Sequence, residues 1–102
     1  MKVQNKIAGL GKQANELISI VQKIAPDRNL LRDFLIDILT PAEYREITTR
    51  WQIVKQLAKG IPQRTIAKNL KVSIATVERG SRELLDENGG FQRVLKILSK
   101  HK

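Results

Sequence analysis

Residues 63–84 of this 102-residue chain contain two short stretches with helical apolar spacing, separated by a three-residue break. The positions expected to share an inward face are Ile66, Ala67 and Leu70 before the break, and Val77 and Leu84 after it. Ser73 ends the break and can cap the second helix, because a serine oxygen accepts hydrogen bonds from the first backbone N–H groups of a helix. The pattern predicts a helix-turn-helix, a unit whose second helix places its N-terminal end in a DNA major groove.

The turn between the two stretches contains Lys71 at a position where glycine is common. A lysine there must adopt the left-handed backbone conformation, or the turn must differ slightly from the usual one. A plain pair of helices without a ligand is the alternative, because two short amphipathic helices are common in proteins.

Basic residues are concentrated in the same stretch. Between Gln63 and Arg82, one acidic residue, Glu78, stands against five basic ones, which are Arg64, Lys68, Lys71, Arg79 and Arg82. The whole chain has a formal net charge of +9 and a pI near 10.3. This charge suits a polyanionic partner, because each Lys or Arg that meets a phosphate releases condensed counterions. Basic surfaces also bind membranes or increase solubility. Here the basic residues lie in the predicted helix-turn-helix, which favours double-stranded DNA as the partner.

Length and composition limit the remaining possibilities. A chain of 102 residues has room for one domain, and its four aromatic residues provide little bulk for a core, which favours a homodimer. The absence of cysteine excludes disulfides and thiolate metal sites, and the single histidine, His101, lies in a basic tail, so we expect no metal. No stretch approaches the ~18 apolar residues of a membrane span and the N-terminus lacks the apolar core of a signal peptide, which predicts a cytoplasmic protein with no membrane partner. The sequence shows no nucleophile–base pair, metal-ligand set or phosphate-binding loop, so we do not expect an enzyme.

Periodicity predicts an all-α chain of six helices over residues 12–102, preceded by a loosely ordered basic arm over residues 1–11. We expect helices at about 12–24, 28–39 and 41–59, two more in the helix-turn-helix of residues 63–84, and a last one after Asn88-Gly89-Gly90. Asp27, Thr40 and Glu43 are expected to cap helices, the last two as a capping box. The expected apolar faces are Leu17, Ile20, Val21 and Ile24; Leu30, Leu31, Phe34, Leu35 and Ile38; Ile47, Trp51, Val54 and Leu57 or Ala58; and Phe91, Val94, Leu95 and Leu98.

Several short motifs together resemble the bacterial Trp repressor family. They are LTPAE at 39–43, TRW at 49–51, PQRTIAKNL at 62–70 and SIATVERGS at 73–81, and the likeness extends from about residue 14 to the C-terminus. The resemblance implies an intertwined all-helical homodimer that binds operator DNA when L-tryptophan, as corepressor, fills a pocket beside each DNA-reading helix. Such a protein represses genes related to tryptophan.

The resemblance also implies roles for particular residues. Arg50 and Arg79 would flank the indole ring, which suits the chemistry of arginine, because a guanidinium plane stacks on an aromatic face and also binds a carboxylate. The other implied corepressor-binding residues are Gly80, Val54, Glu83 and Asp37, with Thr40 and Leu39 from the partner chain. For DNA, the implied residues are Arg64 at a base edge, Ile74, Ala75 and Thr76 in the groove, Gln63, Thr49 and Ser81 near phosphates, and Arg82 as a further basic contact.

Each of these residues also has a purely structural interpretation. Arg79 and Glu83 are one helical turn apart and could form a surface ion pair, Arg50 could be a solvated helix residue, and Val54 could belong mainly to the core. Asp37 and Glu83 stand where the characterised repressors have a leucine and a serine, so they could bind the α-ammonium group of the ligand or indicate a different effector or none. A Trp-repressor-like regulator with another effector, or with ligand-independent DNA binding, is therefore the alternative, and a helical protein-interaction dimer is a more distant one.

Overall fold

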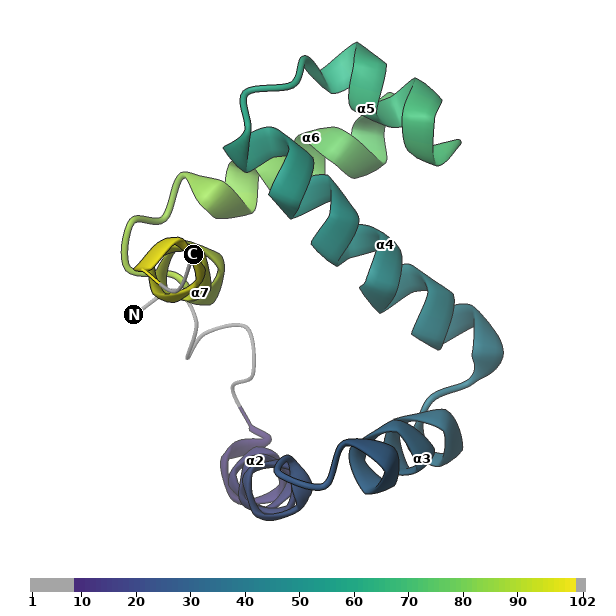
Figure 1. Cartoon of the computed structure of the whole chain (residues 1–102), viewed down its shortest axis with the longest axis vertical. Helices are drawn as coiled ribbons and strands as arrows, with labels where there is room; N and C mark the ends of the chain where they lie inside the picture. The colour runs from purple at the N-terminus through teal and green to yellow at the C-terminus, as the bar shows by residue number, and fades with distance from the viewer. Residues whose placement is uncertain (1–8, 101–102) are drawn as a thin grey trace. The chain divides into compact units, whose positions relative to one another are not determined.

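A computed structural model describes residues 9–100, and this part of the chain is all-helical, with no strand in it (Figure 1). The helices are α2 (Gly11–Ile24), α3 (Arg28–Ile38), α4 (Pro41–Ala58), α5 (Gln63–Leu70), α6 (Ile74–Leu84) and α7 (Gly90–Lys100). The all-α prediction is confirmed, and the helices begin and end within about two residues of the expected positions. Gly11, expected in the N-terminal arm, is the first residue of α2, and residues 1–8 of that arm lie outside the described residues.

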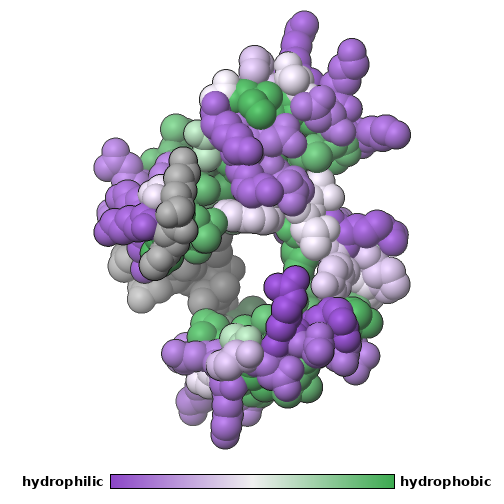
Figure 2. Space-filling view, viewed as in Figure 1, coloured by the Kyte–Doolittle hydropathy of each residue, from purple (hydrophilic) through white to green (hydrophobic). Residues whose placement is uncertain are grey.

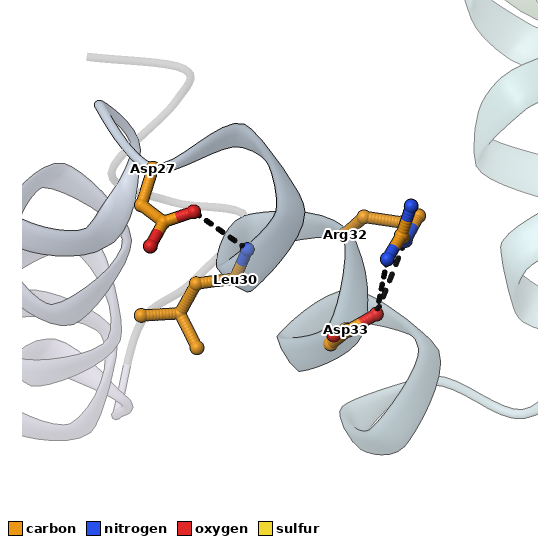
Figure 3. A network of polar contacts seen from close by, with 4 residues as sticks. All are labelled: Asp27, Leu30, Arg32 and Asp33. Atoms are coloured by element: carbon orange, nitrogen blue, oxygen red, sulfur yellow. Dashed lines mark hydrogen bonds and ion pairs between the residues drawn. The ribbon is translucent and has the colours of Figure 1, made fainter.

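Local side-chain caps fix the starts of α3 and α4. The Asp27 carboxylate accepts a hydrogen bond from the backbone N–H of Leu30 at 3.1 Å, as Figure 3 shows beside the ion pair between Arg32 and Asp33. At the start of α4 the Thr40 backbone N–H donates to the Glu43 carboxylate at 2.8 Å, and the Glu43 N–H donates to the Thr40 hydroxyl oxygen at 3.1 Å. Both predicted caps are confirmed.

The capping box also affects the ionisation of Glu43. The hydrogen bond from the Thr40 backbone, followed by the interaction with the Thr40 side chain, lowers the pKa of Glu43 below its ordinary value. The cause is that both contacts favour the ionised form of the carboxyl group.

The chain divides into two compact units, residues 1–44 and residues 45–102, with the boundary inside α4. In the first unit α2 and α3 pack against each other and leave much of their apolar surface uncovered. The residues of these two helices that become half-buried are Ala14, Val21, Ile24, Leu31, Phe34 and Leu35. The inward placement of Leu30 and Ile38 is wrong for the single chain, in which these side chains are 48% and 50% exposed. Neither α2 nor α3 contains a fully buried residue, and apolar side chains are visible at the surface of this unit in Figure 2.

The core of the second unit is small and joins three helices. Ile53 of α4, Ile66 of α5 and Val77 of α6 form a buried cluster. The partly buried residues around it are Leu57, Ile61, Ala67, Leu70 and Val72. Ile66 and Val77 confirm the predicted inward faces of the helix-turn-helix. Ile53 is not among the core residues that periodicity predicts for its helix.

The α6–α7 connection is held by hydrogen bonds around the predicted glycine turn. The Gly89 N–H donates to the Asp86 carbonyl at 2.9 Å, and the Asn88 N–H donates to the Asp86 carboxylate at 3.1 Å. From the first turn of α7, the Gln92 side-chain amide donates to the Leu84 carbonyl at 2.8 Å. This bond satisfies a carbonyl at the C-terminal end of α6, where the helix itself provides no partner, and it links the two helices.

Candidate nucleic-acid interface

The turn between α5 and α6 is closed by backbone hydrogen bonds typical of a helix that ends in a left-handed residue. Lys71 has φ 57° and ψ 46°, so the left-handed conformation is the one adopted of the two alternatives that the sequence left open. The Val72 N–H donates to the Ala67 carbonyl at 3.0 Å, and the Lys71 N–H donates to the Lys68 carbonyl at 3.4 Å, which is the Schellman arrangement. Val72 and Ala67 also pack against the core cluster. The turn therefore fixes the angle at which α6 leaves α5.

The N-terminal end of α6 is capped and exposed. The Ser73 hydroxyl oxygen accepts a hydrogen bond from the Thr76 N–H at 3.1 Å, which confirms the predicted cap, and the hydroxyl groups of Ser73 and Thr76 lie 2.9 Å apart. Ile74 is 41% exposed, and Ala75 and Thr76 are also exposed. The first turn of α6 is thus available to a partner, while Val77 anchors the opposite side of the helix in the core.

The five basic residues of the helix-turn-helix, Arg64, Lys68, Lys71, Arg79 and Arg82, are all exposed. In Figure 2 hydrophilic side chains project from the end of the second unit that carries α5. Among the other residues expected to contact DNA, Gln63 on α5, Thr49 on α4 and Ser81 on α6 are half-buried. The unit therefore combines an exposed helix start with a basic surface, which is the combination expected for a DNA-binding head.

A side-chain contact that the sequence does not suggest links α4 with α5. The Asn69 side-chain amide donates to the Gln56 side-chain oxygen at 3.5 Å, thirteen residues away along the chain. Two polar residues on different helices give no pattern that sequence analysis could detect. With the core cluster, this contact orients α5 on the C-terminal half of α4.

The corepressor residues implied on α4 and α6 lie near the point where these helices approach each other. A Cβ atom placed on Gly80 would lie 2.9 Å from Ile53 Cγ2 and 3.5 Å from Leu57 Cδ1, so the α6 backbone at Gly80 contacts the side chains of α4. Arg50 and Val54 lie within three positions of Ile53 on α4, and Arg79 and Glu83 lie within three positions of Gly80 on α6. These four residues are therefore within about one helical turn, ~5.4 Å along the axis, of the approach point.

These residues differ in their exposure to solvent and in their contacts. Val54 is buried, at 1% exposure, so its structural interpretation as a core residue is supported. Glu83 is half-buried and Arg79 is exposed. The Arg50 guanidinium lies 3.6 Å from the Glu46 carboxylate, one turn earlier on α4, and both side chains are largely exposed. Such surface pairs are worth only a few tenths of a kcal/mol, so Arg50 can leave Glu46 for another partner at small cost.

The remaining implied corepressor residues belong to the first unit. Asp37 is exposed near the C-terminal end of α3, and Leu39, which follows α3, is half-buried. The Thr40 hydroxyl oxygen accepts the Glu43 N–H in the capping box. In the single chain the Asp37 side chain is open to solvent.

Neither a metal-ligand cluster nor a membrane-spanning helix is found among the described residues. Within residues 9–100, no group of three His, Cys, Asp or Glu side chains could hold a metal ion. In the same part of the chain, none of the helices has the length and apolar character needed to cross a membrane.

The known proteins that are similar to this chain point to one family. The model of the family described as "Trp repressor protein" matches residues 12–99. The chain belongs to the Trp repressor family. It is 40% identical over 75 residues to a protein named Trp operon repressor homolog from Haemophilus influenzae (strain ATCC 51907 / DSM 11121 / KW20 / Rd), covering 72% of this chain and 74% of the relative. It is 48% identical over 54 residues to a protein of the same name from Actinobacillus succinogenes, covering 52% of this chain and 54% of the relative.

No solved structure matches this chain significantly. The Trp repressor family consists of transcription regulators and not of enzymes, so this chain is a Trp-repressor-like regulator. The family match covers helices of both compact units, including the whole helix-turn-helix.

Proposed function

We propose that this protein is a homodimeric, cytoplasmic repressor that binds operator DNA and represses tryptophan-related genes when L-tryptophan is bound as corepressor. The observation that carries the proposal is the exposed, capped start of α6 within a basic helix-turn-helix, in a chain that belongs to the Trp repressor family. The Trp repressor is itself one of the established examples of helix-turn-helix docking, and the docking geometry proposed for this chain is that of the family.

On DNA, α6 would enter the major groove with its first turn. Ile74, Ala75 and Thr76 would lie against the base edges, and Arg64 at the start of α5 would read one base. Gln63, Thr49, Ser81 and Arg82 would approach the phosphate backbone, which sets position and affinity more than sequence preference.

The homodimer is supported by the apolar surface that the single chain leaves uncovered. Four apolar residues are buried in the described part of the chain, whereas α2, α3 and α7 carry many exposed ones. These are Leu17, Ile18 and Ile20; Leu30, Ile36 and Ile38; and Val94, Ile97 and Leu98. Exposed apolar surface on this scale is typical of chains that complete their core with a second copy. We expect a dimeric mass by sedimentation at micromolar concentration, and a monomer would contradict both the dimer and a two-fold operator.

In the proposed mechanism, corepressor binding increases the fraction of dimers that have the DNA-binding orientation and does not create a new fold. L-Tryptophan would stabilise the orientation in which the two α6 helices of the dimer lie one DNA turn apart, ~34 Å, and match successive major grooves of a palindrome. The indole would lie between Arg50 and Arg79, beside Gly80 and Val54, with Leu39 and Thr40 supplied by the partner chain. Asp37 and Glu83 would lie near the α-ammonium group, whose positive charge is opposite to that of their carboxylates.

Calorimetric titration with L-tryptophan tests the corepressor directly. We expect binding to the parent dimer and its loss in Arg79→Leu, with unchanged helical content and retained weak DNA binding, because the lost contact is local and the other basic residues remain. Arg93→Leu, which removes an exposed arginine from α7, is the matched control and should bind the ligand normally. A parent protein that binds no L-tryptophan would refute the corepressor and leave the DNA-binding proposal standing.

If the two acids do not bind the α-ammonium group, they indicate the alternative, a regulator whose effector is not L-tryptophan. Indole-3-propionate lacks the ammonium group, so it should bind the parent more weakly than L-tryptophan if Asp37 or Glu83 binds that group. The double variant Asp37→Leu with Glu83→Ser should show a smaller difference in affinity between L-tryptophan and indole-3-propionate. Equal binding of the two ligands would remove the acids from the proposed site.

Binding to duplex DNA separates the regulator from a helical protein-interaction dimer. Affinity for DNA should fall steeply with salt, with a log–log slope of about −0.9 for each phosphate neutralised. A chain that does not bind duplex DNA at low salt would favour the interaction protein.

A further inference from the structure

The exposed side of α6 carries one acidic residue among its basic ones. Glu78 is one helical turn after Ile74 and one turn before Arg82, and all three side chains are exposed. Val77 is buried in the core and Gly80 faces Ile53 of α4, so the opposite side of α6 is occupied. At ~100° per residue, Glu78 therefore lies on the same outward side as the first-turn residues that would meet the base edges.

The Glu78 carboxylate has no partner among the described residues. Within residues 9–100 no hydrogen bond or ion pair engages it, although Arg82 is at the spacing that would allow one. Ion pairs on other helices join Arg32 with Asp33 and Arg50 with Glu46. Within residues 9–100 the negative charge of Glu78 is therefore not paired with a positive side chain, and Glu78 makes no polar contact that holds α6 in place.

An unpaired carboxylate on a surface that approaches DNA has a defined chemical preference. Phosphates repel it, and so do the acceptor atoms of guanine and of thymine in the major groove. A carboxylate can accept a hydrogen bond but cannot donate one. In direct base readout, a glutamate accepts a hydrogen bond from the 4-amino group of cytosine. Adenine also presents an amino donor, but its N7 acceptor lies beside that donor and repels a carboxylate, so cytosine is the base that a glutamate at this position favours.

We propose that Glu78 is a specificity-determining residue that selects a cytosine in each half-site of the operator and weakens binding to sites without it. The inference rests on the proposed DNA-binding function and adds the chemistry of one base position to it. Glu78 lowers the affinity for DNA in general, because its charge opposes the phosphates, while it raises discrimination at one position.

Selection of binding sites from randomised duplex DNA, with L-tryptophan present and absent, provides the test. The variants are Glu78→Ala and Glu78→Gln, and the matched control is Glu87→Ala, which removes an exposed acid from the turn before α7. We expect the parent and the Glu87→Ala control to select a C·G pair at one symmetric position. Glu78→Ala should lose this preference, and Glu78→Gln should lose it or move it to adenine, which glutamine reads.

Competition between the selected site and its C·G→T·A derivative then gives the size of the effect. The parent should discriminate roughly 5- to 100-fold at this position, and Glu78→Ala should discriminate less than about twofold, the usual range for one direct base contact. The affinity of Glu78→Ala for non-specific duplex should rise at low salt, whereas loss of a structural residue would lower it. Circular dichroism checks that both variants keep their helical content.

Failure of the Glu78 role and failure of DNA binding give different results. If the parent binds no duplex DNA, the proposed function fails and Glu78 loses its role with it. If the parent selects an operator and both Glu78 variants select the same one with equal discrimination, DNA binding stands and the role of Glu78 is overturned. An unchanged preference in Glu78→Ala would overturn it by itself, because alanine has no acceptor to offer the cytosine amino group.

Discussion

Replacing Gly80 with alanine tests the close approach of α6 to α4. The new Cβ would lie 2.9 Å from Ile53 Cγ2, closer than two carbon atoms normally approach, and 3.5 Å from Leu57 Cδ1, an ordinary contact. Ile53 is 1% exposed, and its Cγ2 methyl is attached to a branched Cβ, so it cannot turn aside without leaving its preferred rotamer. The strain must be relieved by a shift of α6 or of the core.

Two opposing terms determine the size of the effect. Alanine in the middle of a helix is favoured over glycine by about 1 kcal/mol. Overpacking a well-filled core costs about 1 to 3 kcal/mol. The overpacking cost should lie in the upper part of its range because the contacted methyl is rigid and buried, so we expect Gly80→Ala to lower the free energy of unfolding by about 1 to 2 kcal/mol. For a chain of this length, each kcal/mol corresponds to about 4 to 8 °C in Tm.

Urea and thermal unfolding at one fixed protein concentration would measure the change. Gly90→Ala, at the first position of α7 and with nothing within 4 Å of its added Cβ, is the matched control and should not be destabilised. Ile53→Leu removes the branched methyl with little change in volume, so Gly80→Ala should cost less in that background. If Gly80→Ala is as harmless as the control, or equally harmful in both backgrounds, the Ile53 contact is not the reason for the glycine.

The remaining predictions concern the turn, the capping box and the proposed DNA contact. Lys71→Gly should stabilise the fold by about 1 kcal/mol in urea unfolding, because glycine adopts φ 57° without the steric cost that a Cβ atom brings; unchanged or lower stability would contradict this. Thr40→Ala should destabilise by about 0.5 to 2 kcal/mol in the same assay through loss of the cap, and an unchanged unfolding midpoint would show that the cap contributes nothing. The lowered pKa of Glu43 means that its stabilising effect is fully present above the ordinary carboxyl pKa, ~4.3, and is lost as the pH falls through the lower folded value. Stability should therefore fall more steeply in the parent than in Glu43→Gln as the pH is lowered below ~4.3, and parallel curves would contradict this. Arg64→Ala should weaken operator binding and relax preference at one base position by ~1 to 3 kcal/mol, measured by competition with point-substituted operators; an equal loss on every sequence would assign Arg64 to phosphate.

The sequence by itself determined the helices and their ends. Asp27, the Thr40–Glu43 pair and Ser73 cap helices through contacts that span three residues, so the residue types alone predict them. The left-handed turn at Lys71 was one of two outcomes that the sequence allowed, and the structure decided between them. The exposed start of α6 was predictable for the same reason as the caps, since its cap, periodicity and charge are all local features.

Only the tertiary structure decided which apolar and polar residues meet. Ile53, and not the expected Ile47, lies in the core, and Gly80 is where α4 and α6 touch. Leu30 and Ile38 belong to an apolar face that the sequence predicts, but the single chain leaves both side chains exposed. Helical periodicity shows that a face is apolar, but it does not show which residues pack against that face. Those residues lie far away in the chain, and their positions depend on how the helices cross when they pack.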